Sequence, residues 1–223
     1  MAVTGFSKLG PAAKPWLYAD QGNYFTVASP TAGTGQASGS ITTLADTTPY
    51  LLFKNNSPAL SGIKCYLDFW RLTLTAAGGG GTVRNMTFRL DTSQSTARYT
   101  SGGISFGQGL TNAITNVNAD SGVASQANVY IGALTAATAG VTRLIGNVMM
   151  REIIEIVNDT FLFDFGANNG PSASLATGGT ATTARYFGMP PVVVGPQEYC
   201  LAHYWGASLT AATFENLLGW VEV

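Results

Sequence analysis

Short runs of aromatic and β-branched residues alternate along most of this chain with turns rich in Gly, Ser, Thr, Asn and Pro. These residue types favour pleated strands, and the polar clusters between them favour turns. The clearest runs occupy residues 50–54, 63–75, 83–91, 127–134 and 199–207. No helical pattern alternates with them, as a parallel α/β fold would require. We therefore predict an all-β fold, an antiparallel β-sandwich or jelly roll with an extended N-terminal arm and long polar loops.

Two segments fit both a helix and a strand. Residues 143–157 have apolar residues at helical and at alternate spacing, but turn residues follow them, and then Phe161, Phe163 and Phe165 alternate. This order favours a hairpin. Residues 213–223 favour a strand, with a helix over 208–218 as the competing interpretation.

A proline pair interrupts the extended run at residues 185–196. Proline cannot donate a hydrogen bond to a strand ladder, so Pro190 and Pro191 predict an edge position or a bend.

The first 45 residues differ from the rest. Pro11, Pro15 and Pro30 break any long element, and residues 29–40 have linker composition. Large aromatic residues lie among them, which indicates either an arm that docks on another surface or an ordinary first strand of the domain's own sheet. We expect residues 1–45 to form an extended arm with a first strand, and residues 46–223 to form the sandwich domain.

A second polar stretch, residues 92–126, contains isolated aromatic residues. A loop of this length in a compact domain is usually functional or ordered by a neighbour. Together with the arm, it supplies the candidate interface residues: Trp16, Tyr18, Tyr24, Phe25, Tyr99 and Phe106.

The chain carries few charges. Only 10% of residues are Asp, Glu, Lys or Arg, against about 25% in an ordinary soluble domain. Hydroxyl and amide groups cost less free energy to bury than ions do. A surface built from them therefore predicts self-association or binding to a partner. The 11 basic residues are scattered and face 12 acidic ones, which argues against direct binding of nucleic acid.

The residues that could carry chemistry form no recognisable motif. A single histidine, His203, lies in an aromatic strand and is expected to be packed there, so we predict no metal site. Cys65 and Cys200 are expected to be buried thiols, although a bridge between them stays open. The glycine runs lack the Lys-Ser/Thr of a phosphate loop. A paired-carboxylate hydrolase is the enzyme class that deserves weighing, with candidates Asp68, Asp91, Glu152, Glu155, Asp159 and Asp164.

We predict a non-enzymatic chain without a cofactor. The N-terminus shows no apolar signal core, and no stretch approaches the roughly 20 apolar residues of a membrane span, so we expect synthesis in a cytoplasm and no membrane contact.

Four segments resemble head-associated virion proteins of tailed bacteriophages. They are WLYADQGNYFTVASPTAGTG (16–35), YLDFWRLTLTAAGGGG (66–81), ARYTSGG (97–103) and GPQEYCLAHYWGASLTAATFENLLGWVEV (195–223). The likeness spans most of the chain without a catalytic motif.

This resemblance implies a jelly-roll cement or decoration protein, made in the bacterial host and placed on the capsid exterior. Its partners would be the phage major capsid protein and copies of itself, as a homotrimer. The alternative is a receptor- or glycan-binding module of a phage tail or fibre.

Overall fold

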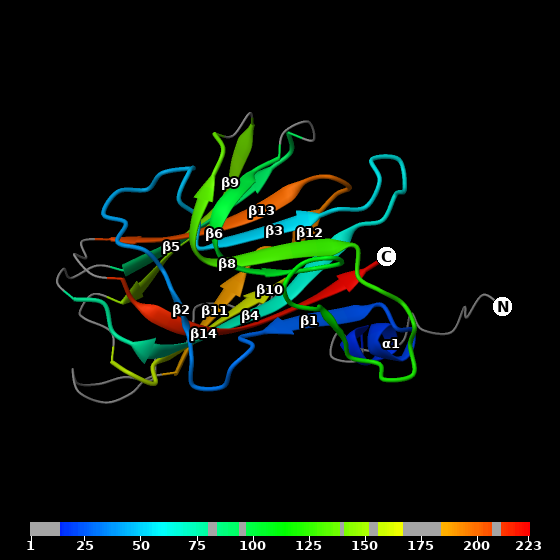
Figure 1. Ribbon diagram of the computed structural model, residues 1–223, viewed down its shortest axis with the longest axis horizontal. Coiled ribbons are helices and arrows are strands. Elements are labelled where there is room, and N and C mark those ends of the chain that lie inside the picture. The colour runs from blue at the N-terminus through cyan, green and yellow to red at the C-terminus, as the bar shows by residue number, and fades with distance from the viewer. Residues whose placement is uncertain are drawn as a thin grey trace.

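The computed structural model describes residues 14–79, 84–93, 97–138, 141–151, 156–166, 184–206 and 211–223. Within them, one helix and fourteen strands form two stacked sheets (Figure 1). In chain order the elements are α1 (Lys14–Asp20), β1 (Tyr24–Ala28), β2 (Gln36–Ala37), β3 (Leu51–Asn55), β4 (Cys65–Ala76), β5 (Arg84–Asp91), β6 (Tyr99–Phe106), β7 (Thr115–Asn116), β8 (Ala127–Ala136), β9 (Thr142–Arg151), β10 (Thr160–Phe165), β11 (Ala184–Met189), β12 (Val192–Val194), β13 (Tyr199–Gly206) and β14 (Thr213–Glu222).

The strand order is that of a jelly roll. Sheet A runs β11-β10-β4-β14-β1-β7, with β12 paired to β4 and β2 to β14; sheet B runs β6-β8-β3-β13-β5-β9. Within these, β1-β14-β4-β10 faces β3-β13-β5-β9, so the chain crosses repeatedly between the sheets as in two Greek keys. The antiparallel pair β6–β8 is an insertion between β5 and β9 that extends sheet B. The predicted all-β sandwich is confirmed.

Alternation along the strands fills the space between the sheets with aromatic rings. Trp70 on β4 and Trp220 on β14 are fully buried. Phe53 meets the Trp220 ring edge-on from sheet B, with ring centroids 5.2 Å apart, and Phe88 meets Trp70 in the same way at 6.1 Å. Such edge-to-face pairs add stability beyond the area that they bury. The two sheets are therefore held in one register by large, rigid side chains.

The hairpin predicted over 143–165 is wrong in its pairing, although both strands exist. β9 pairs with β5 in sheet B, whereas β10 pairs with β4 and β11 in sheet A. The connection therefore passes from one sheet to the other, and its described part turns at Asn158, whose φ is 74°. Asp159 closes that turn because its Oδ2 accepts a hydrogen bond from the Ile156 amide at 2.9 Å.

The C-terminal ambiguities resolve as strands. β14 places Phe214, Leu218 and Trp220 in the core at alternate positions, so the competing helix over 208–218 is wrong for residues 213–218. The proline pair lies at a bend: β11 runs parallel to β10 at the edge of sheet A, and after the prolines β12 moves across to pair with β4. This confirms the predicted edge position and bend.

The N-terminal region is more ordered than its prolines suggested. Pro15 sits in the first turn of α1, where its missing N–H costs nothing. Gly22, at φ 73°, ends the helix: its amide bonds to the Ala19 carbonyl, and the Asn23 amide bonds to that of Tyr18. β1 then pairs with β14 as an ordinary strand of sheet A. The part of the predicted arm at residues 1–13 lies outside the described residues.

The polar stretch at 92–126 is not one long loop, because β6 and β7 lie within it. Gly102 and Gly103, both at positive φ, lie against the carbonyl oxygens of Ala133 and Ile131 on β8. A Cβ at either glycine would clash with that backbone, so an irregular, glycine-bearing strand replaces the apolar alternation that reveals a strand in sequence.

Candidate interaction surface

Three of the six predicted contact residues are not surface residues. Phe25 and Phe106 are 1% and 2% exposed and belong to the core between the sheets. Tyr24 is buried too, and its hydroxyl donates to Asp68 Oδ2 at 2.5 Å. Their aromatic side chains serve the fold of this chain, so the expectation that they contact a partner is corrected.

Tyr99 is half-buried on β6. Its ring stacks on Tyr130 of β8, with centroids 3.9 Å apart, and its hydroxyl donates to the Gly102 carbonyl. These contacts belong to a small apolar cluster on the outer face of sheet B that includes Leu52 and Leu201. Tyr99 therefore covers its own sheet with one face of the ring.

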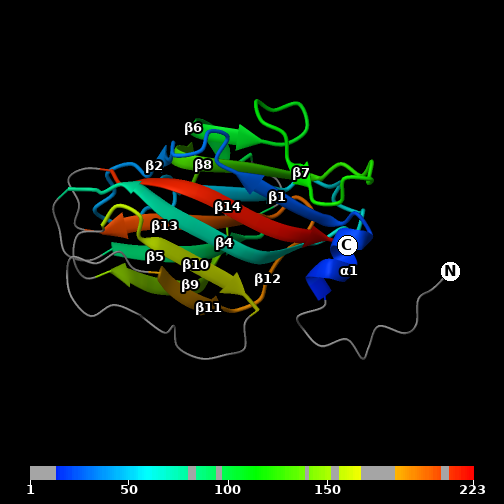
Figure 2. The same ribbon diagram turned by 90° about the horizontal axis from the view of Figure 1, so that it is seen from below.

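Trp16 differs from the others, because its side chain is 80% exposed. It projects from α1, while Tyr18 on the same helix is half-buried. α1 lies at the end of the sandwich where the C-terminus and the β7–β8 connection also lie (Figures 1 and 2). Asn118 in that connection donates to the Asp20 carbonyl at 2.9 Å, and Val223 exchanges backbone hydrogen bonds with Lys64.

Most of the exposed large apolar side chains among the described residues gather on the elements of this end. The α1-end surface, as we call it, consists of Trp16, Leu60, Tyr66, Val117, Val123, Val193 and Val223. Tyr66 and Val193 are direct cross-strand partners on β4 and β12. The remaining exposed apolar residues, Val141, Leu144, Met149 and Val157, belong to β9 and the connections on either side of it. Exposed apolar side chains on the elements of one end of a domain are a feature of interaction surfaces.

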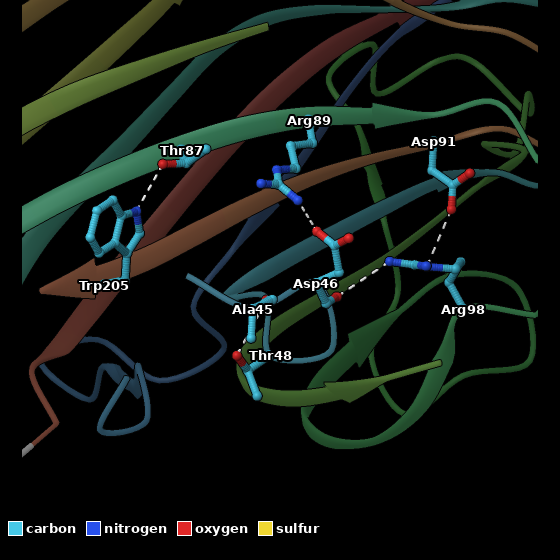
Figure 3. Close-up of polar contacts among 8 residues, drawn as sticks. All are labelled: Ala45, Asp46, Thr48, Thr87, Arg89, Asp91, Arg98 and Trp205. Carbon is cyan, nitrogen blue, oxygen red and sulfur yellow. Dashed lines mark hydrogen bonds and ion pairs between the residues drawn. The ribbon is translucent and has the colours of Figure 1, made fainter. Parts of the chain in front are cut away.

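A second feature is a charged network on the outer face of sheet B (Figure 3). The fully buried side chains of Arg98 and Asp91 approach to 3.3 Å between Nε and Oδ2. Arg89 on β5 forms a salt bridge with Asp46, whose backbone carbonyl also accepts from Arg98 Nη2 at 3.3 Å. Asp91 further accepts from the Ser93 amide. Paired and hydrogen-bonded in this way, the ions fasten two connections onto the sheet.

Beside this network lies His203 on β13, 1% exposed. Its pKa is lowered to about 4, chiefly by burial and also by the nearby Arg89 and Arg98, while Asp46 and the Thr48 backbone act in the opposite direction. The ring is therefore neutral at pH 7. The prediction of a packed histidine is confirmed, but no sequence signal indicated that arginines surround it.

The carboxylates considered for hydrolysis are dispersed, except for one pair. Asp68 and Asp164 lie on the outer face of sheet A, where Tyr24 and Tyr186 each donate a hydroxyl hydrogen bond to one of them at 2.5 Å. Burial raises the pKa of Asp68; the bond from Tyr24 lowers it, and the charge of Asp164 raises it.

The other carboxylates have structural contacts or cannot be assessed. Asp91 is in the ion pair and Asp159 in a turn. Glu152 and Glu155 lie outside the described residues.

Both cysteines, Cys65 and Cys200, are free and buried. Among the described residues there is no group of three or more His, Cys, Asp or Glu side chains that could hold a metal ion. In the same part of the chain, no helix is long and apolar enough to cross a membrane.

The fold is a jelly-roll β-sandwich with exposed apolar side chains on the elements at its α1 end. No protein-family model, curated protein or solved structure matches the chain.

Proposed function

We propose that this chain is a structural protein of a tailed-bacteriophage particle, a cement or decoration protein that binds the outside of the capsid and stabilises it. The α1-end surface is the observation that carries the proposal. The Trp16 indole, which is 80% exposed, is costly to keep in water, and its burial in an interface is favourable.

The composition of the chain supports the same proposal. Only 10% of the residues are charged and the net charge is −1. Most of the surface can therefore be buried in an interface without the free-energy cost of burying unpaired ions. The partners would be the major capsid protein and sister copies in a homotrimer. Each contact would add a modest free energy, which is multiplied over the copies on a particle.

Trp16→Ala tests the proposal directly. We expect it to reduce binding to purified particles that lack this chain by about tenfold or more, as is typical of a buried interface tryptophan. Co-sedimentation of particles with the purified variant measures the loss. Leu144→Ala is the matched control, because Leu144 is also strongly exposed (66%) but lies on β9, away from α1.

Equal occupancy of wild type and Trp16→Ala on the particles would contradict the proposal. Light scattering on the same samples separates the two expected contacts. A variant that binds poorly but stays trimeric places Trp16 against the shell, whereas a variant that becomes monomeric places it between copies.

A receptor- or glycan-binding module is the alternative that the same exposed indole favours, since an aromatic face also packs against a sugar ring. A glycan-array signal from the wild-type chain that Trp16→Ala abolishes, together with no binding to particles, would replace the cement proposal by this one.

A further inference from the structure

The β3–β4 turn, residues 56–63, presents one side chain wholly to solvent. A hydrogen bond from the Ser61 amide to the Pro58 carbonyl, 2.9 Å long, closes it. Leu60 lies at the tip and is 100% exposed, more than any other large apolar residue in the described part of the chain. In Figure 1 the connection projects from the end of the sandwich where the C-terminus lies.

A buried amide holds the two stems of this turn together. Asn55, the last residue of β3, is fully buried, and its Nδ2 donates to the carbonyl groups of Ile63 at 2.9 Å and Val194 at 3.0 Å. Its Oδ1 accepts from the amide of Ser57 at 3.1 Å and from the hydroxyl of the same residue at 2.6 Å. One side chain thus ties both stems to each other and to β12.

Further hydrogen bonds brace each stem from outside. Gln197 Nε2 donates to the carbonyl groups of Asn56 at 3.1 Å and Ser57 at 2.6 Å. On the other stem, Lys64 exchanges backbone hydrogen bonds with Val223 at 2.7 and 3.0 Å. The tip is therefore held in one conformation before any partner binds, and a preorganised element loses little conformational entropy on binding.

The Leu60 side chain takes no part in the fold that supports it. It belongs to neither apolar cluster of the described residues. The stems are held by backbone groups and by the side chains of Asn55, Ser57 and Gln197, and small polar residues or glycine are the usual choice at a turn. A solvated leucine on a rigid support is suited to insertion into a partner, because its burial removes apolar area from water.

The composition of the turn limits the kind of partner. Residues 55–63 include no Asp, Glu, Lys or Arg, so the tip brings no charge to the phosphates of a nucleic acid or of lipid headgroups. Two copies meeting tip to tip would bury only a few side chains, far less than the roughly 1,200 Å² of a stable interface. These observations favour an uncharged apolar pocket in another protein.

We propose that the β3–β4 turn is a rigid anchor whose Leu60 side chain inserts into an apolar pocket of the major capsid protein. This anchor rests on the proposed function, because it would be one contact of the chain with the capsid. Leu60 and Trp16 both belong to the α1-end surface but are carried by different elements. Their contributions to the binding free energy should therefore be nearly additive.

Co-sedimentation with purified particles that lack this chain tests the anchor. We expect Leu60→Ser to weaken binding by about tenfold or more, and Leu60→Met, which keeps an apolar side chain of similar volume, to weaken it by less than about threefold. Leu144→Ser, the same substitution at another strongly exposed leucine, should bind like the wild type. Because Leu60 is fully exposed, Leu60→Ser should melt at nearly the wild-type temperature.

Ala59→Gly tests the rigidity of the anchor, because it loosens the tip and keeps the leucine. We expect it to weaken binding by about two- to fivefold, since a looser turn loses more conformational entropy when the leucine is fixed in a pocket. Wild-type affinity of Ala59→Gly would show that binding does not depend on a preorganised tip, and would overturn the rigid anchor.

The remaining outcomes separate the anchor from the proposed function. Wild-type affinity of Leu60→Ser for the particles would overturn the anchor alone, whereas a wild-type chain that does not bind particles would overturn both. Loss of self-association by Leu60→Ser in light scattering would place the leucine against a sister copy. Co-sedimentation of the wild type, but not of Leu60→Ser, with vesicles of phosphatidylcholine and phosphatidylglycerol would place it in lipid. Either result would refute a pocket in the capsid protein.

Discussion

At the residue scale, Asn216 shows how polar groups are accommodated in this core. It is buried on β14, its Oδ1 accepts a hydrogen bond from the Trp70 indole at 3.3 Å, and its Nδ2 donates to the Tyr50 hydroxyl and the Phe214 carbonyl, both at 2.9 Å. A single amide thus satisfies the polar atoms of two aromatic residues that come from opposite sheets. The rings of these two residues, Tyr50 and Trp70, are stacked with their centroids 5.9 Å apart.

Replacing this amide should be costly. We expect Asn216→Leu to lower the free energy of unfolding by about 2–4 kcal/mol, because the buried Trp70 N–H loses its acceptor and the buried Tyr50 oxygen loses its donor. Urea unfolding followed by fluorescence measures the change. Asn56→Leu, the same substitution at an exposed position, should change stability by less than about 0.5 kcal/mol. Similar midpoints for both variants would contradict the assigned role.

Residue by residue, the sequence predicted environment better than partners. His203 was expected to be packed and it is, but the burial of Arg98 with Asp91 is not visible in a sequence, because the two come together only when the β5–β6 connection folds back. For Phe25 and Phe106 the predicted environment itself was wrong. An aromatic residue in a polar segment has the same sequence signature whether it enters its own core or another molecule's.

At the element scale, β1 decides what can be removed from the N-terminus. Its residues pair with β14 from Tyr24↔Val221 to Ala28↔Leu217, and the Phe25 ring stacks on Trp220 in the core at 6.1 Å. β1 is therefore an integral strand, not part of a detachable arm.

Two truncations follow from this. A chain starting at residue 14 keeps every contact described above and should unfold at nearly the wild-type temperature. A chain starting at residue 29 loses Phe25 and Val27 from the core, which costs about 3–5 kcal/mol, and exposes one edge of β14, so it should aggregate. Circular dichroism melting and size-exclusion chromatography distinguish the two. A soluble, cooperatively folded 29–223 chain would refute the assignment of β1.

Strands rich in aromatic and apolar residues, such as β3, β5 and β13, were predicted almost at their observed bounds. β6 was missed because Gly102 and Gly103 bring its backbone against β8, where side chains have no room. Local sequence patterns also did not predict that β9 and β10 belong to different sheets. Local residue patterns indicate that a segment is a strand, but which strands pair depends on the packing of the whole core.

At the scale of the whole molecule, the two thiols report on the integrity of the sandwich. Cys65 on β4 and Cys200 on β13 are both buried and free. Burial raises the pKa of Cys200 to about 12 and that of Cys65 as well, so at pH 8 almost no thiolate forms in the folded chain.

We expect no thiol to react with Ellman's reagent at pH 8 in buffer over several hours, and two per chain to react in urea. The labelling rate at intermediate urea should follow the unfolding measured by fluorescence. Rapid labelling of one thiol in native buffer would show that the sandwich opens locally, and fewer than two in urea would indicate a bridge.

The position of β14 between β4 and β1 has a consequence for biosynthesis. The centre of sheet A pairs β14 with β1 and β4, which are synthesised much earlier. During translation β1 and β4 therefore lack the strand to which they will form hydrogen bonds. Closure must follow translation of the final strand, and its long-range pairing makes it slow. Until then the nascent chain exposes unpaired strand edges, and we expect chaperones to bind it.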